Sequence, residues 1–172
     1  MDPGRLLAGE YPGHWKTETA RRRLASFLGH GVTRFVDLTH RRDGLDPYAE
    51  ILREEADRLG VVARHSPFPI PDMGVPASRS EMRAVLDCIR EGLHAGETTY
   101  VHCWGGIGRT GTVIGCWLVE SGLEPEAALA TLQQRFLRMP KAHFFGCSPQ
   151  SEVQFDWVRG WRPGRAGAHD RG

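Results

Sequence analysis

The chain has 172 residues, of which 40% are hydrophobic and 25% are charged, and its formal net charge is +1. This length and composition are ordinary for one soluble globular domain that buries a core of its own. A net charge near zero gives no field that would attract nucleic acid or an anionic membrane, so we expect neither as a partner.

The elements predicted from apolar spacing and turn residues alternate between helices and strands. A short apolar segment over 5–10 ends in the turn Tyr11-Pro12-Gly13. The second predicted helix opens with Asp46 as N-cap and Pro47 in the first turn. In chain order we expect a helix over 17–30, a strand over 33–38, a helix over 46–59, a strand over 61–65, a helix over 80–94, a strand over 98–102, and helices over 109–121, 124–137 and 150–161.

Strands separated by helices indicate an α/β fold with a central, mainly parallel sheet of about four to five strands and helices on both faces. We expect residues 1–161 to form this single domain. Residues 162–172 are rich in Gly and Arg and are expected to be a disordered tail. In such sheets ligands bind beyond the carboxyl ends of the strands, which is where Cys103 falls.

The most informative segment is 102–111, His-Cys-Trp-Gly-Gly-Ile-Gly-Arg-Thr-Gly, which links a predicted strand to a predicted helix. Backbone N–H groups of a tight bend and the positive end of a helix can point at one spot and bind an anion. Arg109 adds a planar fork suited to two phosphate oxygens. The same field favours the thiolate of Cys103, which is the reactive form. The segment therefore predicts a phosphate pocket with a nucleophilic sulfur.

Cys103, five intervening residues, Arg109 and Thr110, preceded by His102, resemble the signature of the cysteine-dependent protein tyrosine phosphatase superfamily. The small, dual-specificity-like members are the better match. The resemblance implies hydrolysis of phosphotyrosine, with phosphoserine and phosphothreonine as further substrates, through a phospho-cysteine intermediate. It also implies phosphorylated proteins or peptides as partners, and neither a cofactor nor a metal.

Within this resemblance each residue of the signature has a role. Cys103 is the nucleophile and Arg109 holds the phosphate. His102 hydrogen-bonds the loop backbone and helps to hold the thiolate, and Thr110 donates its hydroxyl to the Cys103 sulfur. The phosphate-binding loop consists of Trp104, Gly105, Gly106, Ile107, Gly108 and Arg109. The loop carries no lysine, which makes a highly charged phosphoinositide a less favoured substrate.

Asp72 is the candidate acid that protonates the leaving oxygen. It is the one carboxylate in a proline-rich loop, 67–76, which leaves the same sheet edge as Cys103. The Pro-Asp-x-Gly-Val-Pro stretch resembles the acid loop of the small members of the superfamily. The alternative is a turn aspartate at the start of a surface loop. Asp37 is the rival carboxylate, which we interpret as structural, tying down a neighbouring loop.

Gln150 and Gln154 are candidates for holding the water that cleaves the phospho-cysteine. They lie one helical turn apart, and the segment 148–154 resembles the glutamine-bearing loop of the superfamily, with Gln154 the firmer match. The alternative is a helix start with Ser148 as cap, Pro149 in the first turn and exposed glutamines.

Two other classes of function remain open: a phosphate-binding module that has lost turnover, and a rhodanese-like sulfurtransferase. The histidines show no metal-ligand spacing with the cysteines. Cys88 could resolve an oxidised Cys103 or could be a core residue, and the same alternatives hold for Cys116 and Cys147. No signal peptide or membrane-spanning run is visible, so a cytoplasmic location is expected, and the oligomeric state is left open.

Overall fold

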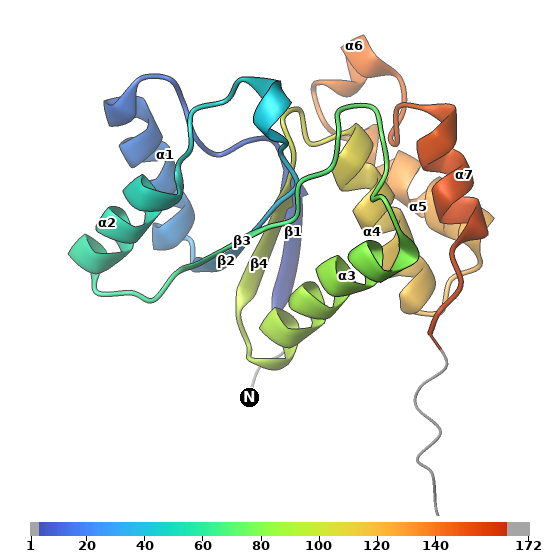
Figure 1. Ribbon diagram of the computed structural model, residues 1–172, viewed down its shortest axis with the longest axis horizontal. Helices are drawn as coiled ribbons and strands as arrows, with labels where there is room; N and C mark the ends of the chain where they lie inside the picture. Colours follow the sequence, from blue (N-terminus) through green and yellow to red (C-terminus); the bar gives the residue numbers. More distant parts are fainter. Residues whose placement is uncertain (1–3, 165–172) are drawn as a thin grey trace, which may run out of the picture.

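The computed structural model describes residues 4–164 of the chain (Figure 1). The elements, in chain order, are β1 (Arg5–Gly9), α1 (Thr17–Gly29), β2 (Val32–Asp37), the 3-10 turn η1 (Arg41–Asp43), α2 (Ala49–Leu59), β3 (Arg64–Pro67), α3 (Arg79–His94), β4 (Thr98–His102), α4 (Gly108–Glu120), α5 (Pro125–Phe136), α6 (Ala142–Phe145) and α7 (Glu152–Gly160).

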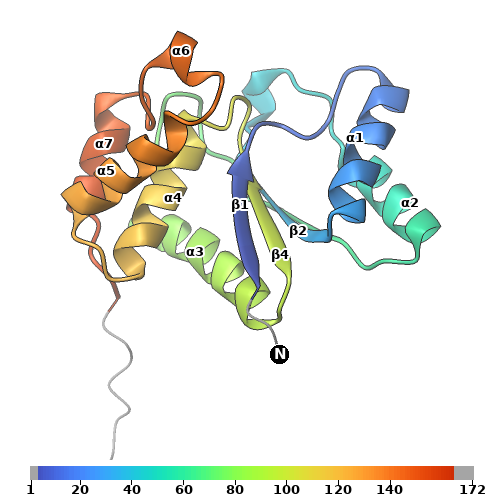
Figure 2. The ribbon, with the colours of Figure 1, turned by 180° about the vertical axis from the view of Figure 1, so that it is seen from behind.

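The strands form one four-stranded parallel sheet in the order β1-β4-β2-β3. β4 lies between β1 and β2, so Val101 is paired with Ala8 on one side and with Val36 on the other. Helices α1 and α2 cover one face of the sheet, and α3, α4, α5 and α7 lie on the other (Figures 1 and 2). The predicted α/β fold, a parallel sheet between two layers of helices, is confirmed.

Each face of the sheet has its own apolar cluster, and β4 contributes to both. Tyr100 packs with Leu24 and Phe35 under α1 and α2. Val101 and Cys103 pack in the cluster on the opposite face, together with residues of α3, α4 and α7. Because side chains alternate along a strand, this placement follows from the two-residue period of β4. It also turns Cys103 toward the layer that contains α4.

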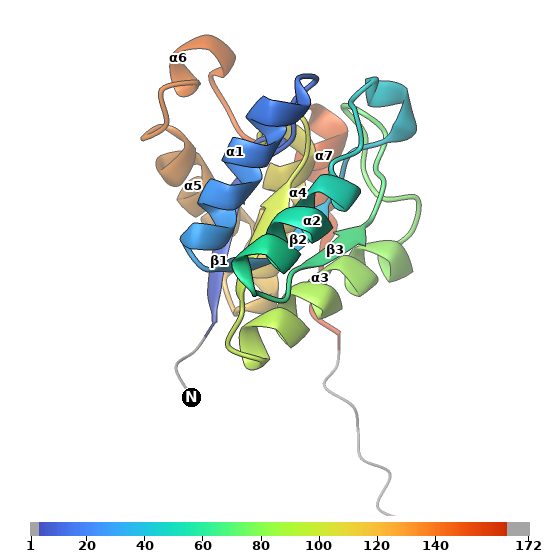
Figure 3. The ribbon, with the colours of Figure 1, turned by 90° about the vertical axis from the view of Figure 1, so that its left-hand side faces the viewer.

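The carboxyl ends of the strands meet at one edge of the sheet. The segments that follow β2, β3 and β4 gather there, and α6 lies at the same end of the molecule (Figure 3). These segments contain η1, the proline-rich loop 67–76 and the loop 103–108. Residues that are far apart in the sequence can therefore act on one ligand at this edge.

Most predicted elements begin and end within two residues of the observed bounds, and α3 shows why. Ser78 caps this helix, with its side-chain oxygen accepting a hydrogen bond from the Glu81 N–H at 3.1 Å. Buried residues then recur at helical spacing along one face, at Met82, Val85, Leu86 and Ile89.

Other elements differ from the predictions in type or in bounds. The entry segment 5–10 contains a strand, β1, and α2 begins at Ala49 rather than at Asp46. The strand predicted over 61–65 is β3, at Arg64–Pro67. Its position follows from its pairing with β2, because Asp37 of β2 pairs with Pro67 of β3. The last helix starts at Glu152 after a capping box on Ser151 rather than at 150. The turns η1 and α6 were not predicted.

The described chain continues past α7 with Trp161, which is buried against the cluster on the α3 face. Arg79 and Arg83 lie over its ring, with centroid distances of 5.7 and 5.2 Å. Of the predicted tail, residues 165–172 lie outside the described residues. Within residues 4–164, none of the helices has the length and hydropathy needed to cross a membrane.

Candidate active site

Cys103 lies at the carboxyl end of β4, directly before the loop that leads into α4. All residues of β4 are buried, and Cys103 itself is only 3% exposed. Trp104, the next residue, is 53% exposed. The chain therefore passes from a deeply placed sulfur to the surface within one residue.

The carbonyl groups of this loop face donors on the surrounding elements. The acceptors and their donors are Trp104 O with Tyr11 N (2.9 Å), Gly105 O with Lys141 Nζ (2.8 Å), Ile107 O with Ser148 Oγ (2.8 Å) and Gly108 O with Thr112 Oγ1 (2.9 Å). In a trans peptide the carbonyl and the following N–H point in opposite directions. The N–H groups of residues 105, 106, 108 and 109 are therefore directed away from these donors, toward the inside of the loop.

Gly106 contributes to this arrangement through its backbone conformation, with a φ of 69°. A left-handed residue within a turn makes successive N–H groups converge and form a concave anion site. Within residues 4–164, the N–H groups of 104–109 donate to no backbone carbonyl. The loop thus presents a set of unused donors beside the sulfur, at the N-terminus of α4.

Arg109 is buried and is held between two carboxylates. Nη1 donates to Asp43 Oδ2 at 2.6 Å and to the carbonyl of Ile70 at 3.0 Å. Nη2 pairs with Asp72 Oδ1 at 3.1 Å. The two ion pairs differ in burial: the Asp43 side chain is 2% exposed and that of Asp72 is 60% exposed. The inner carboxylate fixes the guanidinium, and the outer one is accessible to solvent and ligand.

Asp43 was not predicted as a site residue from the sequence. It lies in η1, which follows β2, the strand next to β4. The sequence offered a partial signal, because a carboxylate in the segment after a parallel strand belongs to the same sheet edge as Cys103, but the strand order that brings it to Arg109 is not visible in the sequence. The capping box between His40 and Asp43 further shows that this turn is built locally.

Asp72 lies in the predicted acid loop, and that loop is fastened to α7. Ser151 Oγ donates to the carbonyl of Met73 at 2.8 Å, and Gln154 Nε2 donates to the carbonyl of Gly74 at 2.9 Å. Met73 has a φ of 58°, an uncommon conformation for a residue with a side chain. The contacts with α7 hold this turn, and with it Asp72, next to Arg109.

The two predicted glutamines lie beside the phosphate loop. A Cβ atom added to Gly108 would come within 2.9 Å of Oε1 of both Gln150 and Gln154. Gln154 is completely buried, and its Oε1 accepts from the N–H groups of Gln150 and Ser151 at 3.0 and 3.2 Å. Its oxygen is therefore saturated by the backbone, whereas the side-chain amide of Gln150 makes no hydrogen bond within the described residues. Gln150 is thus the better placed of the two to bind water.

His102 is part of a buried network behind Cys103. The carbonyl of Cys103 can only accept, so His102 Nδ1, 3.3 Å away, carries the imidazole proton and donates to it. His102 Nε2 is then an acceptor, and it accepts from the hydroxyl of Tyr48 at 2.7 Å; burial raises the pKa of Tyr48 well above its usual value, so this hydroxyl keeps its proton. Burial lowers the pKa of His102 to about 4, so the ring is neutral near pH 7.

Asp37 lies on the outer side of this network. It accepts hydrogen bonds from His65 Nε2 at 2.9 Å and from the backbone N–H and hydroxyl of Thr39 at 2.8 and 2.7 Å. Burial by itself would raise the pKa of Asp37, but the His65 and Thr39 hydrogen bonds help to hold it below its usual value. These contacts fix the segment after β2, as expected for a structural aspartate.

Thr110 is buried, and its hydroxyl has no hydrogen-bond partner within residues 4–164. The predicted hydrogen bond to the Cys103 sulfur is not formed here, so the role of Thr110 stays a prediction. An unpartnered buried hydroxyl next to Arg109 remains available to a bound group.

The four cysteines form no disulfide. Burial raises the pKa of the Cys116 thiol far above its usual value, which keeps it protonated and unreactive. Cys88 is also buried and accepts a hydrogen bond from Arg34 Nη1 at 3.5 Å. Among residues 4–164, no three His, Cys, Asp or Glu side chains lie together in a way that could hold a metal ion.

Comparison with known proteins places this chain in a family. The phosphatase domain family described as "Swiss Army Knife protein, DSP-PTPase phosphatase domain" (PTP-SAK) matches residues 1–159. A candidate tyrosine phosphatase of Invertebrate iridescent virus 3, 067L, is 34% identical over 141 residues, which cover 76% of this chain. The chain spans only 48% of the length of that viral protein, and 37% of an uncharacterised protein of Methanocaldococcus jannaschii that it also matches.

The fold is similar to those of solved phosphatases. The active form of Tk-PTP superposes with a TM-score of 0.64 at 22% identity, covering 91% of this chain and 90% of that one. P. aeruginosa TpbA superposes with a TM-score of 0.64 at 19% identity, covering 92% and 81%. At these identities the likeness concerns the fold.

Proposed function

Given that the chain belongs to the PTP-SAK family of dual-specificity-type protein tyrosine phosphatase domains, we propose that it hydrolyses phosphate monoesters on proteins through a phospho-cysteine on Cys103. Phosphotyrosine is the main proposed substrate, with phosphoserine and phosphothreonine as further ones. We propose residues 1–161 as the domain that carries this activity.

The observation that carries the proposal is the convergence of donors around one sulfur. Outward carbonyls direct the N–H groups of residues 105, 106, 108 and 109 inward, and Arg109 enters from the first turn of α4. A sulfur anion and a phosphate dianion repel each other unless positive charge surrounds both. Amide dipoles, the helix N-terminus and a guanidinium supply that charge without a metal.

In the first step the Cys103 thiolate attacks phosphorus and forms the S–P bond. The P–O bond to the substrate breaks on the opposite side, and the leaving oxygen takes a proton from Asp72. A positioned acid of this kind accelerates such a step by about 10²–10⁴-fold. Asp72 pairs with Nη2 of Arg109, and a bound phosphate would take over that donor while Asp43 keeps Nη1 in place.

In the second step water attacks the phospho-cysteine, Asp72 accepts a proton from that water, and phosphate leaves as the thiolate re-forms. Gln150 is the residue we propose to hold the water. For Gln154 we propose a different role from the predicted one, because its amide is engaged in fastening the acid loop and the start of α7. The neutral His102 keeps the backbone of Cys103 in place through its Nδ1–H.

The depth of the sulfur supports phosphotyrosine as the main substrate. Cys103 is 3% exposed, and a tyrosine ring extends a phosphate further from the peptide backbone than a serine side chain does. Lys141 reaches the loop from far along the sequence, but its ammonium group binds Gly105 O and Glu10 and leaves no unpaired charge for a phosphoinositide headgroup.

Phosphate release from phosphotyrosine, phosphoserine and phosphoinositide substrates tests the proposal. Cys103→Ser should abolish turnover while phosphotyrosine peptides still bind, whereas the matched change at Cys147, a half-buried cysteine, should leave turnover intact. Turnover should persist in EDTA. Binding without turnover by the unmodified chain would indicate an inactive binding module, and thiosulfate:cyanide transfer would indicate a sulfurtransferase.

A further inference from the structure

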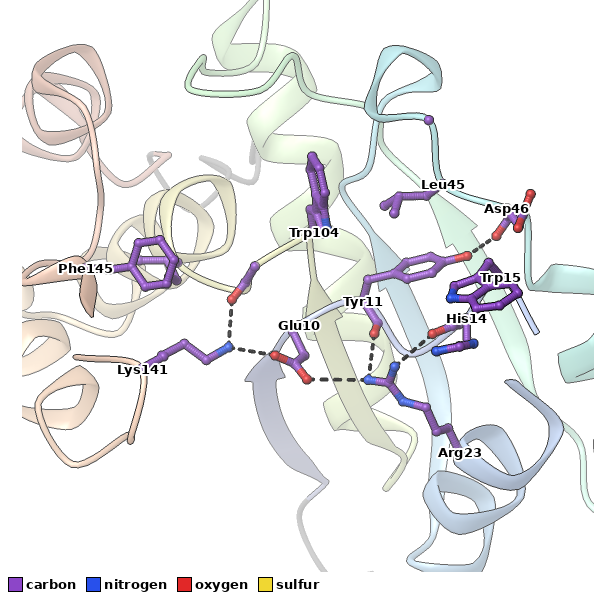
Figure 4. A pocket seen from close by; sticks show the side chains of 14 residues that line it. Glu10, Tyr11, His14, Trp15, Arg23, Leu45, Asp46, Trp104, Lys141 and Phe145 are labelled. Atoms are coloured by element: carbon purple, nitrogen blue, oxygen red, sulfur yellow. Dashed lines mark hydrogen bonds and ion pairs between the residues drawn. The ribbon is translucent and has the colours of Figure 1, made fainter. Parts of the chain in front are cut away.

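An open cavity, about 520 Å³ in volume, lies beside the phosphate loop (Figure 4). It is lined by the segment between β1 and α1, the segment after η1, the loop residues Trp104, Gly105 and Ile107, and the segment around α6. Cys103, Arg109 and Asp72 do not line it, so it is separate from the reacting atoms. Its volume is in the usual range for ligand pockets.

Aromatic and aliphatic side chains form much of the wall of this cavity. They are Trp15, Leu45, Trp104 and Phe145. Trp15 is 72% exposed and Phe145 is 52% exposed. Large apolar side chains held at the surface around a cavity are typical of an interaction site. The walls therefore suit a flat apolar group.

Both cations of the cavity are already paired with a carboxylate or with the backbone. Arg23 donates to the carbonyls of Gly13 and Tyr11 at 2.9 and 3.0 Å, and Lys141 pairs with Glu10 at 3.0 Å. The hydroxyl of Tyr11 donates to the carbonyl of Asp46. Because both cations are engaged and two carboxylates line the cavity, it is a poor site for a second phosphate or an acidic side chain.

We propose that this cavity binds an aromatic side chain that lies close in sequence to the phosphorylated residue of a polypeptide substrate. The inference rests on the proposed phosphatase function. Trp104 and Gly105 belong both to the phosphate loop and to the cavity wall, so a group bound here lies against the loop that would hold the scissile phosphate. The net charge of +1 favours a polypeptide over a nucleic acid, whose binding depends on a strongly basic surface.

Phosphotyrosine peptides that differ at one flanking position test the proposal. Each position on either side of the phosphotyrosine is occupied in turn by Phe, Ala or Glu, and kcat/KM is measured for each peptide with the full chain. We expect one position at which Phe exceeds both Ala and Glu by about three- to ten-fold, the effect of one well-packed aromatic pair.

Two neighbouring phenylalanines of α6 provide matched variants. Phe145 lines the cavity, whereas Phe144 does not line it and is 86% exposed. Phe145→Ala and Trp15→Ala should bring the ratio of kcat/KM between the Phe and Ala peptides toward one. Phe144→Ala should keep the ratio of the unmodified chain. Because the readout is a ratio within each variant, a partial loss of folded protein does not affect it.

Three results would overturn the inference while leaving the phosphatase function standing: equal rates for the Phe and Ala peptides at every position, a preference for Glu, or nucleoside monophosphates turned over faster than any peptide. An equal loss of the ratio in Phe144→Ala and Phe145→Ala would also overturn it. If the unmodified chain releases no phosphate from any of these esters, the proposed function itself fails.

Discussion

Gly105 and Gly106 are neighbours in the phosphate loop, but an added methyl group would meet different surroundings at the two positions. At Gly106 a Cβ atom would lie 2.3 Å from the backbone C and O of Gly9, and the residue has a φ of 69°. At Gly105 the nearest atoms belong to the flexible side chain of Ile107, at 3.8 Å. Alanine at each position thus gives a matched pair.

The expected cost follows from these two differences. A left-handed conformation costs a residue with a Cβ roughly 1–2 kcal/mol, and forcing an atom into packed surroundings costs about 1–3 kcal/mol. Gly106→Ala should therefore lower the free energy of unfolding by about 2–5 kcal/mol. Gly105→Ala involves an ordinary contact and should change it by about 0.5 kcal/mol or less.

The pair also separates stability from anion binding. If Gly106 turns the loop N–H groups inward, its replacement should weaken inhibition by orthovanadate, a phosphate analogue, by more than about tenfold. Gly105→Ala should keep the inhibition constant of the unmodified chain. Urea unfolding measures the first effect, and inhibition of p-nitrophenyl phosphate hydrolysis measures the second. The reasoning fails if Gly106→Ala binds vanadate as tightly as Gly105→Ala does.

Asp43→Asn leaves the buried Arg109 with Asp72, which is exposed, as its only ion-pair partner, and should lower the free energy of unfolding by about 3 kcal/mol, measured in urea. Asp72→Asn should change the free energy of unfolding by less than about 1 kcal/mol but lower kcat by about 10²–10⁴-fold, most for esters with poor leaving groups. A larger loss of stability in Asp72→Asn than in Asp43→Asn would contradict the assigned roles. Gln154→Leu should loosen the acid loop and slow the hydrolysis of esters with poor leaving groups by about tenfold or more. Gln150→Leu should instead slow the second step and so increase the burst of p-nitrophenol. Identical effects of the two variants would refute their separate roles. His102 has a pKa of about 4 in the folded chain and about 6.5 in the unfolded chain, so between these pH values the unfolded state binds one more proton. The free energy of unfolding should therefore fall by about 3 kcal/mol in total as the pH drops from about 6.5 to 4. Urea midpoints measured across this range should fall less steeply in His102→Asn, and an unchanged slope would exclude this buried imidazole as the cause.

The parts of the site that could be predicted are those encoded in continuous segments. Residues 102–111 contain the nucleophile, the glycine bend and the arginine in one stretch, and their strand–loop–helix context is visible in the apolar pattern. The loop around Asp72 could be predicted because its prolines and its place after a strand put the carboxylate at the same edge of the sheet. Local sequence determined both features.

The parts that could not be predicted depend on which segments become neighbours in space. Asp43 follows a different strand, and its partnership with Arg109 follows from the strand order, in which β2 lies beside β4. The role of Gln154 depends on the contact of α7 with the acid loop, 80 residues away in sequence. Spacing suggested that this amide was available, and only the packed structure shows that the backbone already uses it.

The phosphate loop itself is a tertiary structure rather than a local motif. Its carbonyl groups are held by the segment after β1 through Tyr11, by the segment before α6 through Lys141, and by the segment before α7 through Ser148. Each of these bonds orients one peptide plane, and each plane directs the next N–H toward the anion. Cysteine and arginine at the right spacing are therefore insufficient for the pocket. A chain with the same signature but without these distant donors would lack the inward ring of N–H groups, and its sulfur would have little to offset the charge of an approaching phosphate.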